Sequence, residues 1–126
     1  KYVKKIYGIE SSQSSINDAI YNSKSIENIE FIHSEVENIS PDFFKENIDF
    51  VILDPSRKGV HKVALDWIEK LLPDRIVYVS CELKTLKRDL DRLTNNYSIR
   101  KVIPVDMFPH TKHVECIVSL YRTNKL

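Results

Sequence analysis

The sequence predicts an α/β fold, with a mostly parallel sheet, helices on both faces and a terminal antiparallel hairpin. Strand-like apolar segments alternate with segments of helical periodicity along most of the 126 residues. Residues 49–54 and 75–80 contain nearly uninterrupted apolar runs, which are typical of strands buried on both faces. The last two strand-like segments, 97–108 and 113–122, are joined by a short loop without a helix, and strands joined in this way pair antiparallel.

The first part of the chain is expected to hold a strand, a helix, a second strand and a short helix or turn. These elements are assigned, in order, to residues 3–9, 14–22, 29–32 and 41–47. The helix is supported by Ile16, Ala19 and Ile20, which recur at helical spacing behind serines that can cap its first turn.

Two amphipathic helices are predicted, one before and one after the strand at 75–80 in the sequence. The first, over residues 61–72, carries an apolar face made of Val63, Ala64, Trp67, Ile68 and Leu71. The second, over residues 83–93, carries basic residues opposite an apolar stripe made of Leu83, Leu86, Leu90 and Leu93. Helices with one apolar face cover a sheet with that face.

Length, charge and cysteine content exclude several classes of protein. The length fits one domain with one core, and no apolar run is long enough to cross a bilayer. The formal net charge of +1 does not indicate a basic nucleic-acid-binding domain. The two cysteines, Cys81 and Cys116, do not form a secreted disulfide framework, and no signal peptide is visible, so we expect a cytoplasmic protein that does not bind membranes.

Side chains that could bind a ligand or take part in a reaction follow four of the predicted strands. They are Glu10, Glu35, Asp54 and Cys81, and ligands of open α/β sheets bind at the carboxyl ends of such strands. An acid after an early strand often binds ribose hydroxyls, so Glu10 is a candidate nucleotide ligand, with a solvated loop acid as the competing interpretation. Pro55 stiffens the turn after Asp54, although such a turn can be purely structural.

Cys81 lies where a buried strand ends and a helix begins near Leu83, whose N-terminal dipole favours a thiolate. If the last strand lies antiparallel beside this one, it brings His113, Glu115 and Cys116 close to Cys81. A thiol beside a carboxylate can add to a substrate while the carboxylate moves a proton. Cys116 is one position from Glu115, so we expect it on the opposite face, in the core.

Three segments carry a family resemblance: LDPSRKG (53–59), VYVSCE with the following TLKRDL (77–90), and VIPVDMFPHTKHVEC (102–116). In order and spacing they resemble the signature segments of the RNA (uracil-5-)-methyltransferases, and the match runs from about Tyr7 to Arg122. The resemblance implies a Rossmann-like methyltransferase. Such an enzyme transfers a methyl group from S-adenosylmethionine to carbon 5 of a uridine in rRNA or tRNA.

The resemblance also implies roles for individual residues. Cys81 is implied as the nucleophile that adds to carbon 6 of the uracil, and Glu115 as the base that removes the carbon 5 proton. Asp54 is implied as a catalytic-loop residue near the uracil, and we also assign it to the cofactor's surroundings. Glu10 resembles the ribose ligand, and Glu35 the acid near the cofactor's adenine.

Cationic and imidazole side chains in the matching segments are candidates for contacts with RNA. Arg57 and His110 are the principal ones, with Lys58 and Lys112 beside them, and a solvated surface charge is the competing interpretation. His110 and His113 together would make a weak metal pair without a third ligand, so no metal site is predicted.

Three positions depart from the family's usual pattern. Ser56 replaces a second proline, and we expect only a looser turn. Glu82 and Leu83 replace Asn-Pro, and a carboxylate next to Cys81 is expected to disfavour the thiolate. Residues 33–35, His-Ser-Glu, replace a Gly-Asp pair.

With only Gly8 and Gly59, the sequence contains no match to the glycine-rich loop that cradles the cofactor. We therefore expect residues 1–126 to be the C-terminal portion of a single catalytic domain, inactive alone. The first strand, that loop and an RNA-binding domain would then lie upstream. An iron–sulfur cluster, if the full protein carries one, would also lie upstream, and we expect a monomer whose partner is RNA.

Two other classes of protein compete with this hypothesis. A non-catalytic RNA-binding or scaffolding relative would explain Glu82 as decay of the active site, but decay would not spare Cys81, Glu115 and Asp54 together. A nicotinamide-binding Rossmann domain would use Glu10 on a ribose, but its glycine-rich fingerprint is not present.

Overall fold

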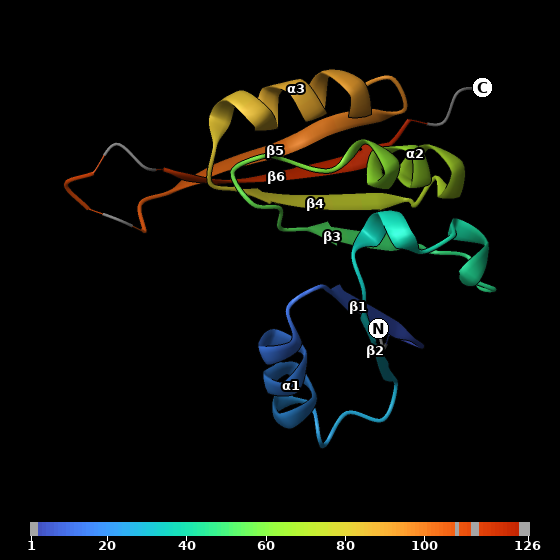
Figure 1. The fold of residues 1–126 in the computed structure, drawn as a ribbon. Coiled ribbons are helices and arrows are strands. Elements are labelled where there is room, and N and C mark those ends of the chain that lie inside the picture. Colours follow the sequence, from blue (N-terminus) through green and yellow to red (C-terminus); the bar gives the residue numbers. More distant parts are fainter. Residues whose placement is uncertain (1–2, 108, 112–113, 124–126) are drawn as a thin grey trace. The chain divides into compact units, whose positions relative to one another are not determined.

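The computed structural model describes residues 3–107, 109–111 and 114–123 (Figure 1). The chain divides into two compact units, Lys1–Ser40 and Pro41–Leu126. Within the described residues, no helix is both long and apolar enough to cross a membrane.

The unit Lys1–Ser40 is a strand–helix–strand unit. Strand β1 (Ile6–Glu10) lies parallel to β2 (Ile29–His33), with α1 (Gln13–Asn22) between them in the chain. The side chain of Ser12 caps α1, as the run of serines predicted. A short 3-10 helix, η1 (Val36–Asn38), follows β2. All three predicted elements are present, although β1 starts three residues later than the predicted strand.

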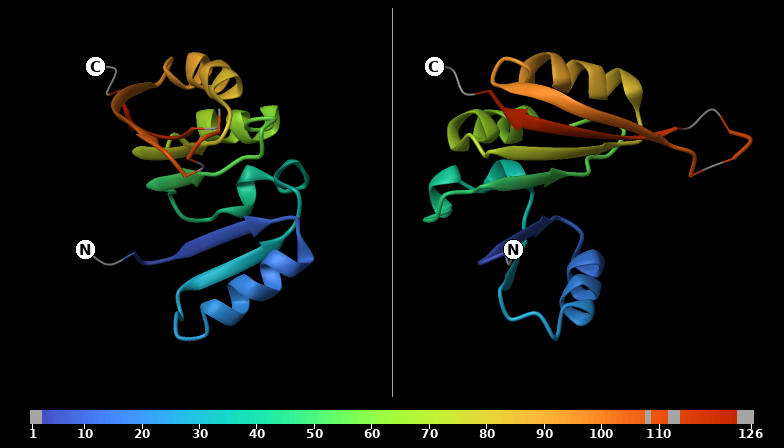
Figure 2. Two further views of the ribbon diagram at one scale, coloured as in Figure 1. Left: turned by 90° about the vertical axis from the view of Figure 1, so that its left-hand side faces the viewer. Right: turned by 180° about the vertical axis from the view of Figure 1, so that it is seen from behind.

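The unit Pro41–Leu126 contains a four-stranded mixed sheet in the order β3-β4-β6-β5. Its elements are η2 (Pro41–Phe43), β3 (Phe50–Leu53), α2 (Lys62–Leu71), β4 (Arg75–Ser80), α3 (Leu83–Leu93), β5 (Tyr97–Val105) and β6 (Glu115–Arg122). Strand β3 is parallel to β4, whereas β6 is antiparallel to both β4 and β5. The predicted terminal antiparallel hairpin is thus confirmed, and the right-hand view of Figure 2 shows it at one edge of the sheet.

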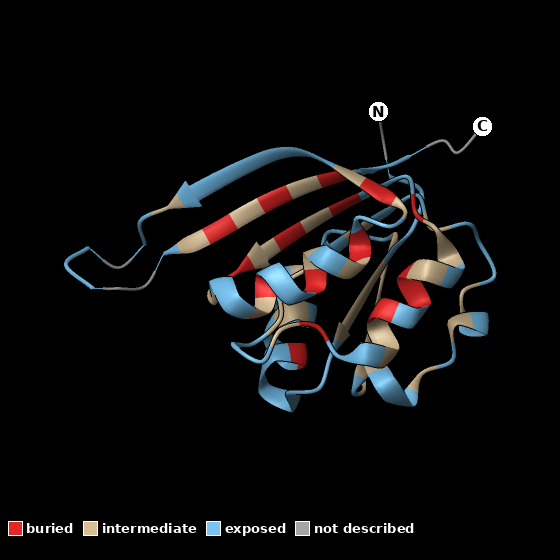
Figure 3. Cartoon of the chain, turned by 90° about the horizontal axis from the view of Figure 1, so that it is seen from above, coloured by how far each residue is buried: buried red, intermediate tan, exposed pale blue. Residues whose placement is uncertain are grey.

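The core of this unit lies between the sheet and its two helices. Alternate residues of β4 and β6 are buried, as Figure 3 shows, and they form one cluster with side chains of α2 and α3. The buried residues of β4 and β6 are Ile76, Tyr78, Ser80, Cys116, Val118 and Leu120. Both helices therefore cover the same face of this sheet. The second helix layer that the alternation predicted is not seen over it within the described residues of the unit.

Three predictions of burial are wrong. Strand β3 is not buried on both faces, because Phe50 and Ile52 are 45% and 64% exposed, and β3 pairs with β4 on one side only within the described residues. In β4, only alternate residues are fully buried. On α3, Leu83 is 56% exposed at the first turn, whereas Asp89, which the predicted stripe left out, is fully buried.

Candidate functional site

The hairpin brings Glu115 to the end of β4 where Cys81 lies. The register of β4 with β6 ends at the pair Ser80–Cys116. Cys81 is the first residue after β4, and Glu115 is the first residue of β6. Residues directly opposite in antiparallel strands have Cα atoms roughly 4.5–5.5 Å apart and side chains on the same face. Cys81 and Glu115 are both half-buried. The register therefore supports the predicted pairing of a thiol with a carboxylate.

Cys116 belongs to the opposite face. It is 5% exposed and part of the core cluster, and burial raises the pKa of its thiol. A thiol held neutral in a core is a poor nucleophile. The prediction that Cys116 is a core residue is thus confirmed.

Glu82 forms the N-cap of α3. Its side chain accepts a hydrogen bond from the Lys84 N–H at 3.2 Å, and its carbonyl accepts one from the Leu86 N–H at 3.0 Å. The Ser80 hydroxyl fixes this turn, because it donates to the Glu82 carbonyl and accepts from the Glu82 N–H. The carboxylate is therefore stabilised by the helix N-terminus, which gives this departure from the family pattern a structural role.

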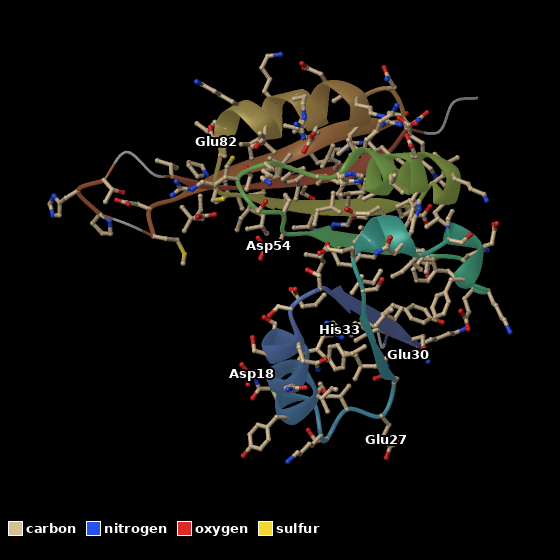
Figure 4. All side chains as sticks on the ribbon, in the orientation of Figure 1. Asp18, Glu27, Glu30, His33, Asp54 and Glu82 are labelled. Carbon is tan, nitrogen blue, oxygen red and sulfur yellow. The ribbon has the colours of Figure 1, made fainter. Side chains whose placement is uncertain are left out.

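Asp54 lies at the same end of this sheet. It follows β3 directly and is exposed. The parallel register of β3 with β4 ends with Leu53 opposite Tyr78. Asp54 is therefore the next residue along the chain beside Val79, which lies two residues before Cys81. Figure 4 labels Asp54 and Glu82, which both lie at this end of the sheet.

The loop after Asp54 leads back to α3. Arg57 and Lys58 are exposed, and their carbonyls accept hydrogen bonds from the Thr85 hydroxyl at 3.2 Å and from Arg88 Nη2 at 3.2 Å. Both cationic side chains are therefore carried beside the first turns of α3. Their predicted role in binding RNA stays a prediction.

The hairpin tip carries His110, which is exposed and has a left-handed backbone with φ of 66°. Lys112 and His113 lie outside the described residues. Among the described residues, no group of three or more side chains could hold a metal ion. The contact of His110 with substrate stays a prediction.

Glu10 is the last residue of β1, and Glu35 lies two residues after the end of β2. The Ser34 N–H donates to the Glu10 carbonyl at 3.0 Å, so the two strand ends lie side by side. One carboxylate oxygen of Glu10 accepts from the Ser12 N–H at 2.7 Å, and Glu35 is exposed and makes no side-chain capping bond. These two acids therefore gather at one strand end of their own unit. The sequence predicts that the carboxyl ends of all four strands form one site. These ends belong to two separate units, so the common site stays a prediction.

Asp89 is the residue that the sequence analysis missed. It lies three residues after Leu86 and four before Leu93, so it shares their buried face. A single acid on an otherwise apolar helix face was the available signal, because a carboxylate is buried only with partners.

Comparison with known proteins identifies the family. The family model of the tRNA (uracil-5-)-methyltransferases matches residues 1–123. A protein of Bacillus cereus described as an uncharacterised RNA methyltransferase is 43% identical over 97% of this chain. The chain spans 28% of that relative's length.

Solved structures agree with this assignment. The tRNA (uracil-54, C5)-methyltransferase of Pyrococcus abyssi, solved with S-adenosyl-L-homocysteine, matches 92% of this chain with a TM-score of 0.79 and 33% identity. The match covers 28% of that protein. The N-methyltransferase NodS of Bradyrhizobium japonicum matches 97% of this chain and 68% of its own, with a TM-score of 0.74. At 15% identity, that likeness supports the Rossmann-like methyltransferase fold alone. The chain belongs to the tRNA (uracil-5-)-methyltransferase family.

Proposed function

We propose that this chain is the nucleophile-bearing C-terminal portion of an enzyme that methylates carbon 5 of a uridine in rRNA or tRNA. The observation that supports the proposal is the register of β4 with β6, whose last pair, Ser80–Cys116, is directly followed by Cys81 on one side and preceded by Glu115 on the other. Family membership supports the reaction class. The relatives are several times longer than this chain, so the proposed activity is that of the full-length protein.

Carbon 5 of uracil is too weak a nucleophile to take up a methyl group unaided. The Cys81 thiolate adds to carbon 6, and the electron pair of the carbon 5–carbon 6 double bond moves to carbon 5 and the neighbouring carbonyl. After methylation, the Glu115 carboxylate removes the proton that remains on carbon 5. The electrons of that C–H bond restore the double bond and expel the thiolate, which regenerates Cys81.

Glu10 and Glu35 fit a nucleoside-type cofactor. Both are exposed carboxylate acceptors at one strand end, where one suits ribose hydroxyls and the other an adenine amino group. The Ser12 N–H holds one oxygen of Glu10 and leaves the other to accept a hydroxyl. When bound, S-adenosylmethionine supplies an electrophilic methyl group to this chemistry.

The substrate must be presented with its base out of the stack. Carbon 6 is not accessible in a stacked helix, so the uridine has to be flipped out or unpaired. Arg57 and Lys58 lie on the loop that follows Asp54, and α3 adds the exposed Lys84. We assign to Arg57 and His110 contacts with the phosphates or base of the displaced nucleotide.

RNA that contains 5-fluorouridine tests the proposal. Fluorine at carbon 5 cannot leave as a proton, so the full-length protein, supplied with S-adenosylmethionine, should stall as a covalent protein–RNA adduct. The adduct is detected on a denaturing gel and by mass spectrometry. Cys81→Ala should abolish it, and the matched Cys116→Ala should not.

The contradicting result is equally clear. If RNA and cofactor both bind but no adduct forms, Cys81 is not a nucleophile, and a non-catalytic RNA-binding relative becomes the better account. If an adduct forms, the carboxylate of Glu82 is tolerated beside the reacting thiol.

A further inference from the structure

We propose that Asp89 is a positioning residue that, through Tyr78 and Arg88, holds the 54–60 loop at the sheet end where Cys81 lies. This inference rests on the proposed function, because the loop carries Asp54 and Arg57. Asp89 itself is far too enclosed to touch a substrate, since its side chain is 0% exposed.

The buried carboxylate is fully engaged. Its Oδ2 accepts hydrogen bonds from the Tyr78 hydroxyl at 2.7 Å and from the Val60 N–H at 2.8 Å. Its Oδ1 accepts one from Arg88 Nε at 2.8 Å. Burial and the Asp89 carboxylate raise the pKa of Tyr78, so its hydroxyl remains a donor at physiological pH. One side chain thus joins β4, α3 and the end of the loop.

Helix α3 also holds the loop by its carbonyls. Arg88 Nη2 donates to the carbonyls of Lys58 at 3.2 Å and Val60 at 3.3 Å. The Thr85 hydroxyl donates to the carbonyl of Arg57 at 3.2 Å. These contacts fix the backbone and leave the Arg57 and Lys58 side chains exposed for a ligand.

Gly59 permits this close approach. Its φ is 77°, and a Cβ added there would lie 2.7 Å from Asp89 Oδ2 and 2.9 Å from Thr85 Cβ. The chain therefore passes over Asp89 at a distance that a side chain would not allow.

A role in positioning explains why a carboxylate is buried here. Replacing buried ionic groups by apolar residues of similar volume is often neutral or stabilising, so stability alone would favour leucine. A hydrogen-bonded carboxylate instead fixes the direction of each partner. The partners here are the strand that leads to Cys81 and the loop that leads from Asp54.

The test compares two buried tyrosines of the same core. Tyr78→Phe removes a hydroxyl bonded to Asp89, whereas Tyr97→Phe removes a buried hydroxyl that has no hydrogen-bond partner among the described residues. In the full-length protein, Tyr78→Phe should slow adduct formation with 5-fluorouridine RNA about tenfold, because the loop no longer holds Asp54 and Arg57 in place. Amide exchange at Gly59 and Val60 should rise about tenfold. Tyr97→Phe should change none of these.

Equal adduct rates for the two variants, or unchanged exchange at Gly59 and Val60 in Tyr78→Phe, would overturn the proposal. Asp89→Asn checks the same link from the other side and should raise exchange at both amides at least as much. If the wild-type protein forms no adduct, the proposed function fails separately, and the exchange data alone then decide whether Asp89 holds the loop.

Discussion

At the end of the ladder between β4 and β6, the two faces of the sheet place similar side chains in different surroundings. On the covered face, Ser80 and Cys116 are buried against the core. On the open face, one residue further along each strand, Cys81 and Glu115 are half-buried. One residue along the chain therefore separates a position that packs in the core from the half-buried position of Cys81, the proposed nucleophile.

The largest effect is expected from a change at Glu115, the proposed base. Glu115→Gln should lower turnover about a thousandfold, because the proton on carbon 5 then has no acceptor. With ordinary uridine, a covalent methylated adduct should accumulate, which single-turnover quenching and denaturing gels would detect. Asp91→Asn, which alters an exposed carboxylate on α3, serves as the control. Slow turnover without an accumulated adduct would show that Glu115 acts before or outside the proton-removal step.

Thiol reactivity compares the two faces directly. Cys81 should react with iodoacetamide about a hundredfold faster than Cys116, because burial both shields Cys116 and raises the pKa of its thiol. Peptide mass spectrometry at pH 8 gives both rates in one sample. In denaturant the two rates should converge, and similar rates in the native protein would remove the distinction between the faces.

The helix that follows Cys81 depends on its cap. Glu82→Ala should destabilise the protein by about 1 kcal/mol, because the Lys84 N–H loses its acceptor. Glu82→Asn keeps a capping oxygen and should retain most of that stability. Urea unfolding of both variants measures the difference. If Glu82→Ala is as stable as the wild type, the carboxylate has no capping role, and its place beside Cys81 needs another explanation.

The smallest effect concerns the helix layer over the covered face. Arg92 of α3 donates hydrogen bonds to Glu69 of α2 at 2.6 Å, and these lower the pKa of Glu69 from its ordinary value of 4.5. A lowered pKa means that the stabilisation is complete above pH 4.5 and is lost as the pH falls through the lower, folded-state value.

Glu69→Gln should therefore cost up to about 1 kcal/mol at pH 7, since a partly exposed ion pair contributes little, and progressively less below pH 4.5. Urea unfolding of both proteins between pH 7 and pH 3 measures this difference. A difference that grew on acidification would contradict the sign. The open face should be unaffected, so the labelling rate of Cys81 at pH 7 provides the control.

Local patterns in the sequence were enough to predict most elements and the pairing across the hairpin. The alternation of apolar and helical segments gave α1, α2 and α3, and the short connection to β6 required an antiparallel pair. The predicted pairing of Cys81 with Glu115 would extend that ladder by one residue pair and stays a prediction.

Long-range contacts were not predictable in the same way. An apolar run such as β3 looks alike whether one face or two are covered, so the exposure of Ile52 could not be read from it. The partners of Asp89 could not be deduced from the sequence of α3, because Tyr78 and Val60 are 11 and 29 residues away. The capping role of Glu82 depends on the position at which α3 begins, which the sequence does not fix to a single residue.

The most direct test of the account is to map the protein–RNA adduct that forms with 5-fluorouridine. Tryptic digestion and tandem mass spectrometry of the trapped complex identify the residue bonded to the nucleotide. We expect one linkage, at Cys81, and unmodified Cys116 in the same digest. A linkage at Cys116, or none in a protein that binds both RNA and cofactor, would contradict it.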